Sequence, residues 1–220
     1  ENPDATTIEE LRNGIKEAQK RLFKPIFGCE MYCARRGKEK KSEKIDQSGW
    51  HLIVLAKNEK GYHNLIKLVS RSYVDGFYMR PRTDHEDLER FREGLIICSA
   101  CIGGELPKKI QAGDMEGALQ TASWFKSIWG DDYYIELQRH EVKNPAIRAN
   151  RDIYPLQMDI NRGLLEVARQ LDIKIICSND SHFVDEENAE AHDRLLCLGT
   201  NRDVGAQHRM LYSKQEWFKT

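Results

Sequence analysis

An aspartate and a histidine, two residues that often hold metals or catalyse reactions, stand close together in the segment C-S-N-D-S-H-F at 177–183. The segment follows an apolar run at 173–176 that is typical of a buried strand. In an extended chain the side-chain period is two, so Asp180 and His182 are expected to point the same way. Such a pair at the carboxyl end of a strand is typical of metal and catalytic sites in α/β proteins. The alternative is an Asx turn that closes the strand, with His182 solvated beside it.

Three further groups of this chemical kind lie within or at the ends of other predicted strands. Glu30 lies inside the apolar string PIFGCEMYCA, where an acid is rarely buried unless it is paired or bound to a cation. His51 opens HLIVLA, and Cys101 ends GLIICSAC before two glycines that permit a tight turn. Carboxylate, imidazole and thiolate are the ligand types of zinc, manganese and iron sites. The alternatives are a core ion pair for Glu30, a strand-edge histidine for His51 and an inert thiol for Cys101.

Structural roles are expected for most other cysteines and histidines. His63, His85 and His208 are expected at the surface, and Cys29, Cys33, Cys98 and Cys177 are expected to be inert buried thiols. A single C-x-x-C without a second pair does not indicate a structural zinc knuckle.

Two histidines are candidates for a place beside the site, and neither is assigned as a ligand. His140 ends the strand-like ELQRH and could approach the ligands. His192 lies in the helical EAHDRLL, where packing or a hydrogen bond beneath the ligands is favoured over direct ligation. Elsewhere, Arg80 and Arg82 with Tyr78 suit a phosphate or DNA contact, and a plain solvated loop is the alternative.

The elements that must position these groups alternate between strand and helix patterns, which favours βαβ units and a parallel sheet or barrel. Residues 35–48 are charged and are expected to form a mobile surface loop. Thr7 and Glu10 have the spacing of a capping box. Strands are expected at 25–34, 51–56, 94–101, 132–137 and 174–177, and helices at 7–22, after Asn58, and at 85–91, 105–112, 114–129, 155–171, 186–198 and near 213–219.

Composition limits the function classes. The 34 basic and 35 acidic residues nearly cancel, which argues against nucleic-acid binding through bulk charge. No apolar stretch approaches the roughly 20 residues that span a bilayer, so no membrane association is expected. Six cysteines, mostly in apolar runs, fit a reducing compartment, and a cytoplasmic protein is expected.

The amino-acid sequences of several segments resemble the PHP (polymerase and histidinol phosphatase) domain of bacterial DNA polymerase III alpha subunits. The resemblance is strongest to the alpha subunits of Bacteroidetes. The strings that carry the resemblance are KPIFGCEMY, WHLIVLAKNEKGYHNLIKLVS, GFYMRPR, GLIICSACIGGELP, DDYYIELQRH, NDSHF with EAHDRLLC, and LYSKQEWF. They span about residues 22–220.

The resemblance implies a distorted seven-stranded βα barrel that gathers about three metals with nine ligands. By the family motifs, zinc or manganese ligands would be Glu30 of G-C-E, His51, Cys101, and the pair Asp180 and His182 of N-D-x-H.

The family's H-x-H and T-D-H-G motifs do not occur in this sequence. Five core strands instead of seven, and the helix that opens the chain, lead us to expect an incomplete α/β barrel from a longer protein. The expected divisions are 1–24, the end of an insertion; 25–205, the PHP domain; and 206–220, the start of the connection toward the polymerase palm.

The resemblance also implies the function of the intact protein, which would be a DNA-directed DNA polymerase, a nucleotidyltransferase whose magnesium-binding aspartates lie downstream. Its partners would be DNA, deoxynucleoside triphosphates, a proofreading exonuclease subunit, the sliding clamp and the clamp loader. Its PHP domain could be a metal-dependent 3′–5′ exonuclease or phosphoesterase, or alternatively a purely structural, partner-docking domain. From these 220 residues alone we expect an incomplete, weak metal site and negligible nuclease activity.

Overall fold

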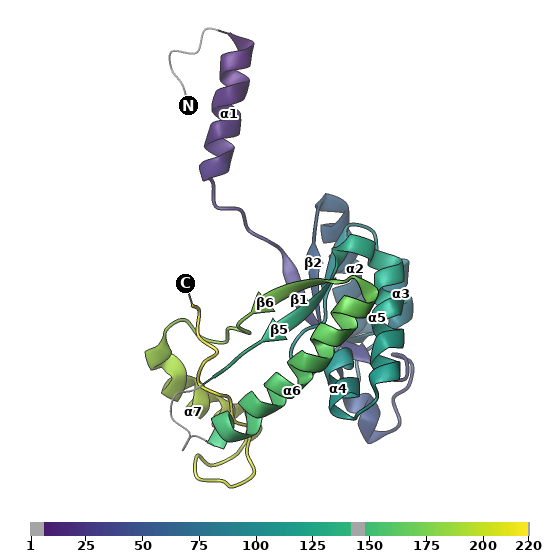
Figure 1. Ribbon diagram of the computed structural model, residues 1–220, viewed down its shortest axis with the longest axis vertical. Coiled ribbons are helices and arrows are strands. Elements are labelled where there is room, and N and C mark those ends of the chain that lie inside the picture. Colours follow the sequence, from purple (N-terminus) through teal and green to yellow (C-terminus); the bar gives the residue numbers. More distant parts are fainter. Residues whose placement is uncertain (1–6, 142–147, 220) are drawn as a thin grey trace.

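The apolar strand-like runs form a six-stranded sheet in the computed structural model, which describes residues 7–141 and 148–219 (Figure 1). The strand order is β3-β1-β2-β4-β5-β6, with β3 and β6 at the two edges. Five strands match the predicted ones, and β3 is an additional two-residue strand inside the predicted loop at 76–84. The bounds are β1 Gly28–Ala34, β2 Gly49–Ala56, β3 Arg82–Thr83, β4 Leu95–Cys98, β5 Tyr133–Gln138 and β6 Lys174–Ser178.

The sheet is mixed, so the expectation of an all-parallel sheet is wrong for one strand. β2 runs antiparallel to both β1 and β4, whereas β1 with β3, β4 with β5, and β5 with β6 are parallel. No helical crossover of the kind that parallel pairing requires separates β1 from β2. Because β2 is reversed, its beginning lies at the edge where β1, β4, β5 and β6 end. His51 near the start of β2 therefore lies among the carboxyl ends of the other strands.

Helices cover the sheet and close the apolar core. Val54, Ile97 and Ile135, from three neighbouring strands, are completely buried, and Phe125 of α5 and Leu164 of α6 pack into the same cluster. The helices are α1 Ile8–Arg21, α2 Glu59–Val74, α3 His85–Arg90, α4 Glu105–Gln111, α5 Met115–Trp129, α6 Arg148–Leu171 and α7 Ala189–Thr200, with 3-10 turns at Lys44–Gln47, Gly130–Asp132 and Glu186–Asn188. None of the helices in the described ranges is long and apolar enough to cross a lipid bilayer.

Three helix predictions need correction. The helix expected to begin at Pro155 is α6, which begins at Arg148 and carries Pro155 within it. The helix expected at 186–198 begins with a 3-10 turn before α7. The short helix expected near 213–219 does not form, because this segment runs alongside the chain that follows β6, where the backbone N–H of His182 donates to the Glu216 carbonyl at 2.7 Å.

Residues 35–48 form a mostly exposed loop, as their charge predicts, but part of the loop packs against the interior. They enclose the side chain of Arg82, which is fully buried, and this contradicts the expected phosphate or DNA contact for that arginine. A buried guanidinium must have its N–H groups satisfied within the protein. Its donors reach the backbone carbonyls of Gly76, Lys38, Lys40 and Asp46.

Further ion pairs fix the same segment. Lys38 is 4% exposed, and its Nζ lies 3.4 Å from Asp84 and 3.0 Å from Asp87. Asp46 is 1% exposed and accepts hydrogen bonds from Arg36. We refer to this set as the buried charge cluster: Arg36, Lys38, Asp46, Arg82, Asp84 and Asp87.

Helix α1 forms as predicted but stands away from the sheet. Thr7 and Glu10 make the predicted capping box, which fixes where the helix begins. In Figure 1 the helix is joined to β1 only by an extended connection. None of its side chains is buried.

Candidate metal centre

Three side chains from three elements bring possible metal-ligating atoms together at the carboxyl edge of the sheet. Glu30 comes from β1, His51 from β2, and Cys101 from the turn after β4. One ligand atom from each lies within 4.8 Å of the others. The Nδ1 atom of His51 is 2.7 Å from Glu30 Oε1 and 3.6 Å from Cys101 Sγ.

The sheet register explains why the first two meet. Tyr32 pairs with His51 across β1 and β2, and Glu30 precedes Tyr32 by two residues on the same face. Glu30 and His51 are therefore diagonal neighbours, and such neighbours are within reach of long side chains. The ring of Tyr32 packs edge-on against His51, with centroids 5.1 Å apart.

The turn after β4 places the thiol. Ala100 adopts a left-handed conformation, with φ of 60°, directly before Cys101. This conformation is costly for a residue with a Cβ and is often found at functional sites. The Gly103 N–H then donates to Cys101 Sγ at 3.4 Å, and the Gly103 carbonyl accepts from the His51 N–H at 3.0 Å. A Cβ at Gly103 would lie 3.0 Å from the His51 ring, so a glycine fits closely here.

The electrostatics of the three groups favour a cation between them. Hydrogen bonds to Cys101 and then Glu30 raise the pKa of His51 to about 10. The hydrogen bond from His51 lowers the pKa of Glu30. Positive charge is thus favoured at this point, and a bound metal would take the place of the imidazole proton. All three side chains remain accessible, with Glu30 exposed and His51 and Cys101 partly buried. The donor set and its accessibility thus fit a transition metal such as zinc.

Asp180 and His182 lie near this cluster, but for a different reason from the one predicted. Strand β6 ends at Ser178, and Asp180 has a left-handed φ of 47°, so the pair is not on an extended strand. Instead a tight turn lets Nδ1 of His182 donate to the Asp180 carbonyl at 2.6 Å. Nε2 is then the ring nitrogen that a metal could bind, and in this structure it forms a hydrogen bond with the Tyr212 hydroxyl at 3.1 Å.

Asp180 is a partly buried carboxylate beside this cluster. Burial raises the pKa of Asp180, and the nearby Glu30 carboxylate acts in the same direction, whereas His182 acts in the opposite direction. His182 in turn acts on the pKa of Glu30. Glu30 therefore lies within electrostatic range of both Asp180 and His182, although among the described residues the tight group consists of Glu30, His51 and Cys101 alone.

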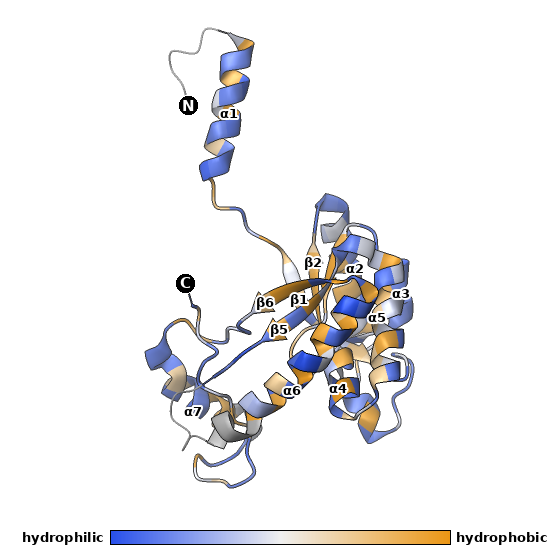
Figure 2. Ribbon diagram, viewed as in Figure 1, coloured by the Kyte–Doolittle hydropathy of each residue, from blue (hydrophilic) through white to orange (hydrophobic). Residues whose placement is uncertain are grey.

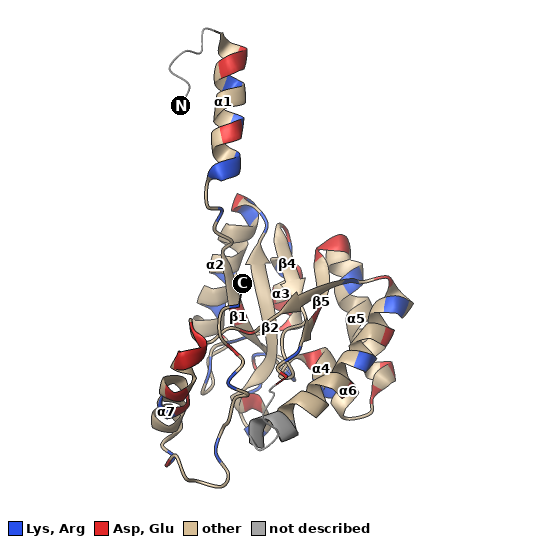
Figure 3. Cartoon of the chain, turned by 60° about the vertical axis from the view of Figure 1, so that its left-hand side comes forward, with Lys and Arg blue, Asp and Glu red and all other residues tan. Residues whose placement is uncertain are grey.

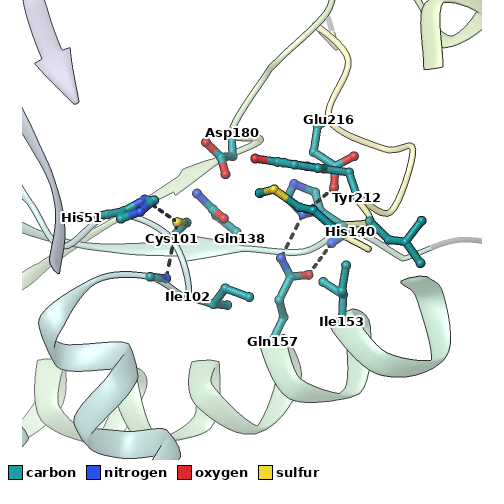
Figure 4. A pocket seen from close by; sticks show the side chains of 13 residues that line it. His51, Cys101, Ile102, Gln138, His140, Ile153, Gln157, Asp180, Tyr212 and Glu216 are labelled. Carbon is teal, nitrogen blue, oxygen red and sulfur yellow. Dashed lines mark hydrogen bonds and ion pairs between the residues drawn. The ribbon is translucent and has the colours of Figure 1, made fainter. Parts of the chain in front are cut away.

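A cavity of about 190 Å³ opens beside the cluster (Figure 4). Sequence analysis predicted four of its lining residues as site residues. It missed Gln138 at the end of β5, Gln157 on α6, and Tyr212 and Glu216 from the C-terminal segment. Gln138 could have been found from its place at a strand end, but no local pattern marks the others. The predicted residues on the lining are His51, Cys101, His140 and Asp180.

The two supporting histidines differ in their surroundings. His140 is 3% exposed; its Nε2 donates to the Asn179 carbonyl and its Nδ1 accepts from Gln157, both at 2.9 Å. It therefore holds the turn that leads to Asp180. The ring of His192 packs at a tilt against Phe183 and edge-on against Tyr212 near His182, and burial lowers its pKa.

The remaining predicted site residues divide between surface and interior. Arg80 is exposed, and it donates to the Tyr32 hydroxyl at 3.0 Å while lying over that ring. It thus reaches the rim of the metal cluster, whereas Arg82 does not. Figure 3 shows basic and acidic residues intermixed along α1 and no single large basic face in that view.

The other cysteines agree with their expected structural roles in part. Cys33 and Cys98 are buried, and burial raises the pKa of both thiols. Cys29 is partly buried, and burial raises its pKa as well. The expectation of a buried thiol is wrong for Cys177, which is exposed because β6 is an edge strand with one open face.

Comparison with known proteins identifies similar sequences. The family described as PHP domain matches residues 4–140. DNA polymerase III subunit alpha of Borreliella burgdorferi is 43% identical over 92% of this chain and 17% of its own length. The corresponding subunits of Treponema pallidum and Thermus aquaticus are 36% and 34% identical, over 89% and 92% of this chain and 16% of their own lengths. The chain thus spans about one sixth of the length of these relatives.

Proposed function

The chain belongs to the PHP domain family, and we propose that it forms the metal-holding part of the PHP domain in a bacterial DNA polymerase III alpha subunit. The similarity to three such subunits over about nine tenths of the chain supports this proposal. The whole protein would then synthesise DNA from deoxynucleoside triphosphates on a template, using magnesium at a site outside these residues. Its partners would be DNA and other replication proteins, including a proofreading subunit, the sliding clamp and the clamp loader.

The observation that carries the metal proposal is the convergence of Glu30, His51 and Cys101. Carboxylate, imidazole and thiol atoms from three separate elements approach within 4.8 Å. A structural ion pair needs only two of them, and the thiol would be unnecessary. Zinc is the metal that this donor set suits best, and manganese is the second candidate. Asp180 and His182 would add ligands from the facing turn.

The reaction that this site suits is hydrolysis of a phosphate ester, such as the 3′ end of DNA. A bound metal would activate water and stabilise negative charge on phosphate oxygens. Arg80 at the rim would hold a phosphate group by its guanidinium. The Tyr212 hydroxyl, next to Asp180, would donate a hydrogen bond to a substrate oxygen, while the cavity would hold the adjoining nucleoside.

A specific observation supports the alternative, a scaffold that braces the polymerase and docks partners. The 220 residues contain neither H-x-H nor T-D-H-G, so this chain supplies only part of the family's ligand set. Binding without turnover is therefore the expected behaviour of these residues alone.

Metal binding can be tested with cobalt as a spectroscopic probe. Cobalt added to the chelator-treated chain should give a thiolate-to-cobalt absorption band at one equivalent. Cys101→Ser should abolish the band, whereas Cys177→Ser, which removes an exposed thiol on β6, should leave it unchanged. A band that survives Cys101→Ser, or disappears with Cys177→Ser, would place the metal elsewhere.

Hydrolysis is tested separately with a 3′-labelled single-stranded DNA and the zinc- or manganese-loaded chain. Metal binding without release of the label would agree with the expected partial site. Turnover that is lost in Glu30→Gln would show that these residues suffice for catalysis and would contradict the scaffold.

A further inference from the structure

Helix α1 carries an apolar stripe that nothing in the described chain covers. Ile8, Leu11, Ile15 and Leu22 recur at the three- and four-residue spacing of one helix face. Their exposed fractions are 71%, 49%, 58% and 68%. Figure 2 shows hydrophobic positions alternating with hydrophilic ones along this helix. An isolated helix of this length is only marginally stable in water, so a stripe of this kind predicts a packing partner.

A second exposed stripe lies on α2. Tyr62, Ile66 and Tyr73 follow the same helical spacing and are 41%, 44% and 61% exposed. The stripe continues beyond the helix to Phe77, whose ring stacks on Tyr73 with centroids 6.5 Å apart. It lies beside the buried face of α2 that contains Leu65 and Leu68, so a second helix could pack along its flank without disturbing the core.

The connection between the two helices already reaches the start of the second stripe. Residues 22–27 join α1 to β1, and the ring of Phe27 lies 5.3 Å from that of Tyr62. Connections of two to six residues are the usual length between a helix and the strand that follows it in α/β units. The linker is therefore long enough for α1 to turn back over α2.

We propose that the exposed stripe of α2 is the docking surface for α1 of the same chain, with the two helices antiparallel. The stripes match in length, because α1 is about 21 Å long and α2 about 24 Å long. Antiparallel packing brings the basic last turn of α1, with Lys20 and Arg21, to the beginning of α2 near Glu59. It also aligns the helix dipoles favourably.

The linker favours the chain's own helix over that of a second copy. A short connection gives the docking partner an effective concentration in the millimolar range, well above that of a second copy at micromolar protein. Docking would also hold residues 22–27, which lead directly into β1 and hence toward Glu30. The proposal concerns packing of α1 and does not depend on metal binding.

Hydrogen exchange of the α1 amides tests the proposal on the whole chain. A docked α1 should exchange at least tenfold more slowly than an unstructured peptide, and the double variant Ile66→Gln/Tyr73→Gln should abolish this protection. Glutamine is a good helix former and both positions are exposed, so α2 itself should remain protected. Lys60→Gln, an exposed change on another face of α2, is the matched control and should leave α1 protected.

Three outcomes would overturn the proposal. The first is fast exchange of α1 in the wild-type chain, and the second is protection that persists in the double variant. The third is protection that rises with protein concentration together with a dimer in sedimentation equilibrium, which would identify a second copy as the occupant. Protection that is lost in the double variant and independent of concentration supports docking within one chain.

Discussion

Two groups of charged residues lie at the same sheet and are organised in opposite ways. In the buried charge cluster, Arg82 is fully buried, and its guanidinium donates four hydrogen bonds to backbone carbonyls of its own chain. In the candidate metal cluster, which consists of Glu30, His51 and Cys101, Glu30 is exposed and the possible ligand atoms of all three lie within 4.8 Å of one another. The first group is complete without a ligand, whereas the second has the accessibility and donor atoms to accept one.

This difference indicates how charged side chains that stabilise the fold can be distinguished from those that could bind a ligand. A charge removed from water must be compensated within the protein, so its partners are numerous and fixed. A ligand site instead keeps its groups partly accessible and brings unlike donor types to one point. Loss of a structural charge should therefore reduce stability, and loss of a ligand should reduce binding while stability is nearly kept.

The largest expected effect is the loss of Arg82. Arg82→Ala should lower the free energy of unfolding by about 3–5 kcal/mol, because four backbone carbonyls lose their donor and three of these hydrogen bonds are buried. Urea unfolding measures this change. Arg80→Ala, in the same segment but exposed, should change stability by less than about 0.5 kcal/mol. Equal effects of the two substitutions would remove the distinction between the clusters.

Substitution of a candidate metal ligand should reduce metal affinity and leave the stability of the chain nearly unchanged. Cys101→Ser should weaken zinc binding about 100-fold, which corresponds to about 2.7 kcal/mol. The stability of the metal-free chain should change by less than about 1 kcal/mol, since the thiol is only partly buried. Competition with a chromophoric chelator measures the affinity, and Cys177→Ser serves as the control. If unfolding rather than binding responds, the metal cluster is structural.

A smaller effect is expected at Tyr212. Its hydroxyl lies 3.1 Å from Nε2 of His182, the nitrogen that a metal would need. Tyr212→Phe should therefore tighten zinc binding about threefold, or about 0.7 kcal/mol, by removing one competing hydrogen bond. The same chelator competition measures it, with Tyr134→Phe as the control. Weaker binding in Tyr212→Phe would indicate that the hydroxyl supports the metal site instead.

The smallest expected effect is a difference in melting temperature that appears only at acidic pH. The hydrogen bond from Arg36 lowers the pKa of Asp46 far below its usual range. A carboxylate with a lowered folded-state pKa stabilises the protein above its unfolded pKa of about 4, and this contribution is lost as the pH falls toward the folded value. The melting temperature should therefore fall more steeply below about pH 4 in the wild-type chain than in Asp46→Asn. Parallel curves for the two proteins would show that Asp46 adds nothing to the buried charge cluster.

Local patterns predicted most of the elements because they depend on neighbours in sequence. The capping box of Thr7 and Glu10, the cap at Asn58 and the five apolar strands were all confirmed. The same patterns failed where contacts with residues distant in the sequence determine the local structure. Within residues 35–48, three backbone carbonyls accept hydrogen bonds from Arg82, and no local rule shows that a charged segment will enclose a buried guanidinium.

The sequence by itself determined the types of element and the chemical kinds of the candidate ligands, since both follow from side-chain identity and short-range spacing. Only the tertiary structure decided that β2 runs in reverse and so brings His51 to the edge where Glu30 and Cys101 lie. It also decided that Tyr212 joins them from the far end of the chain. Strand direction and long-range contacts depend on how the whole core packs, and that information is distributed over residues far apart in the sequence.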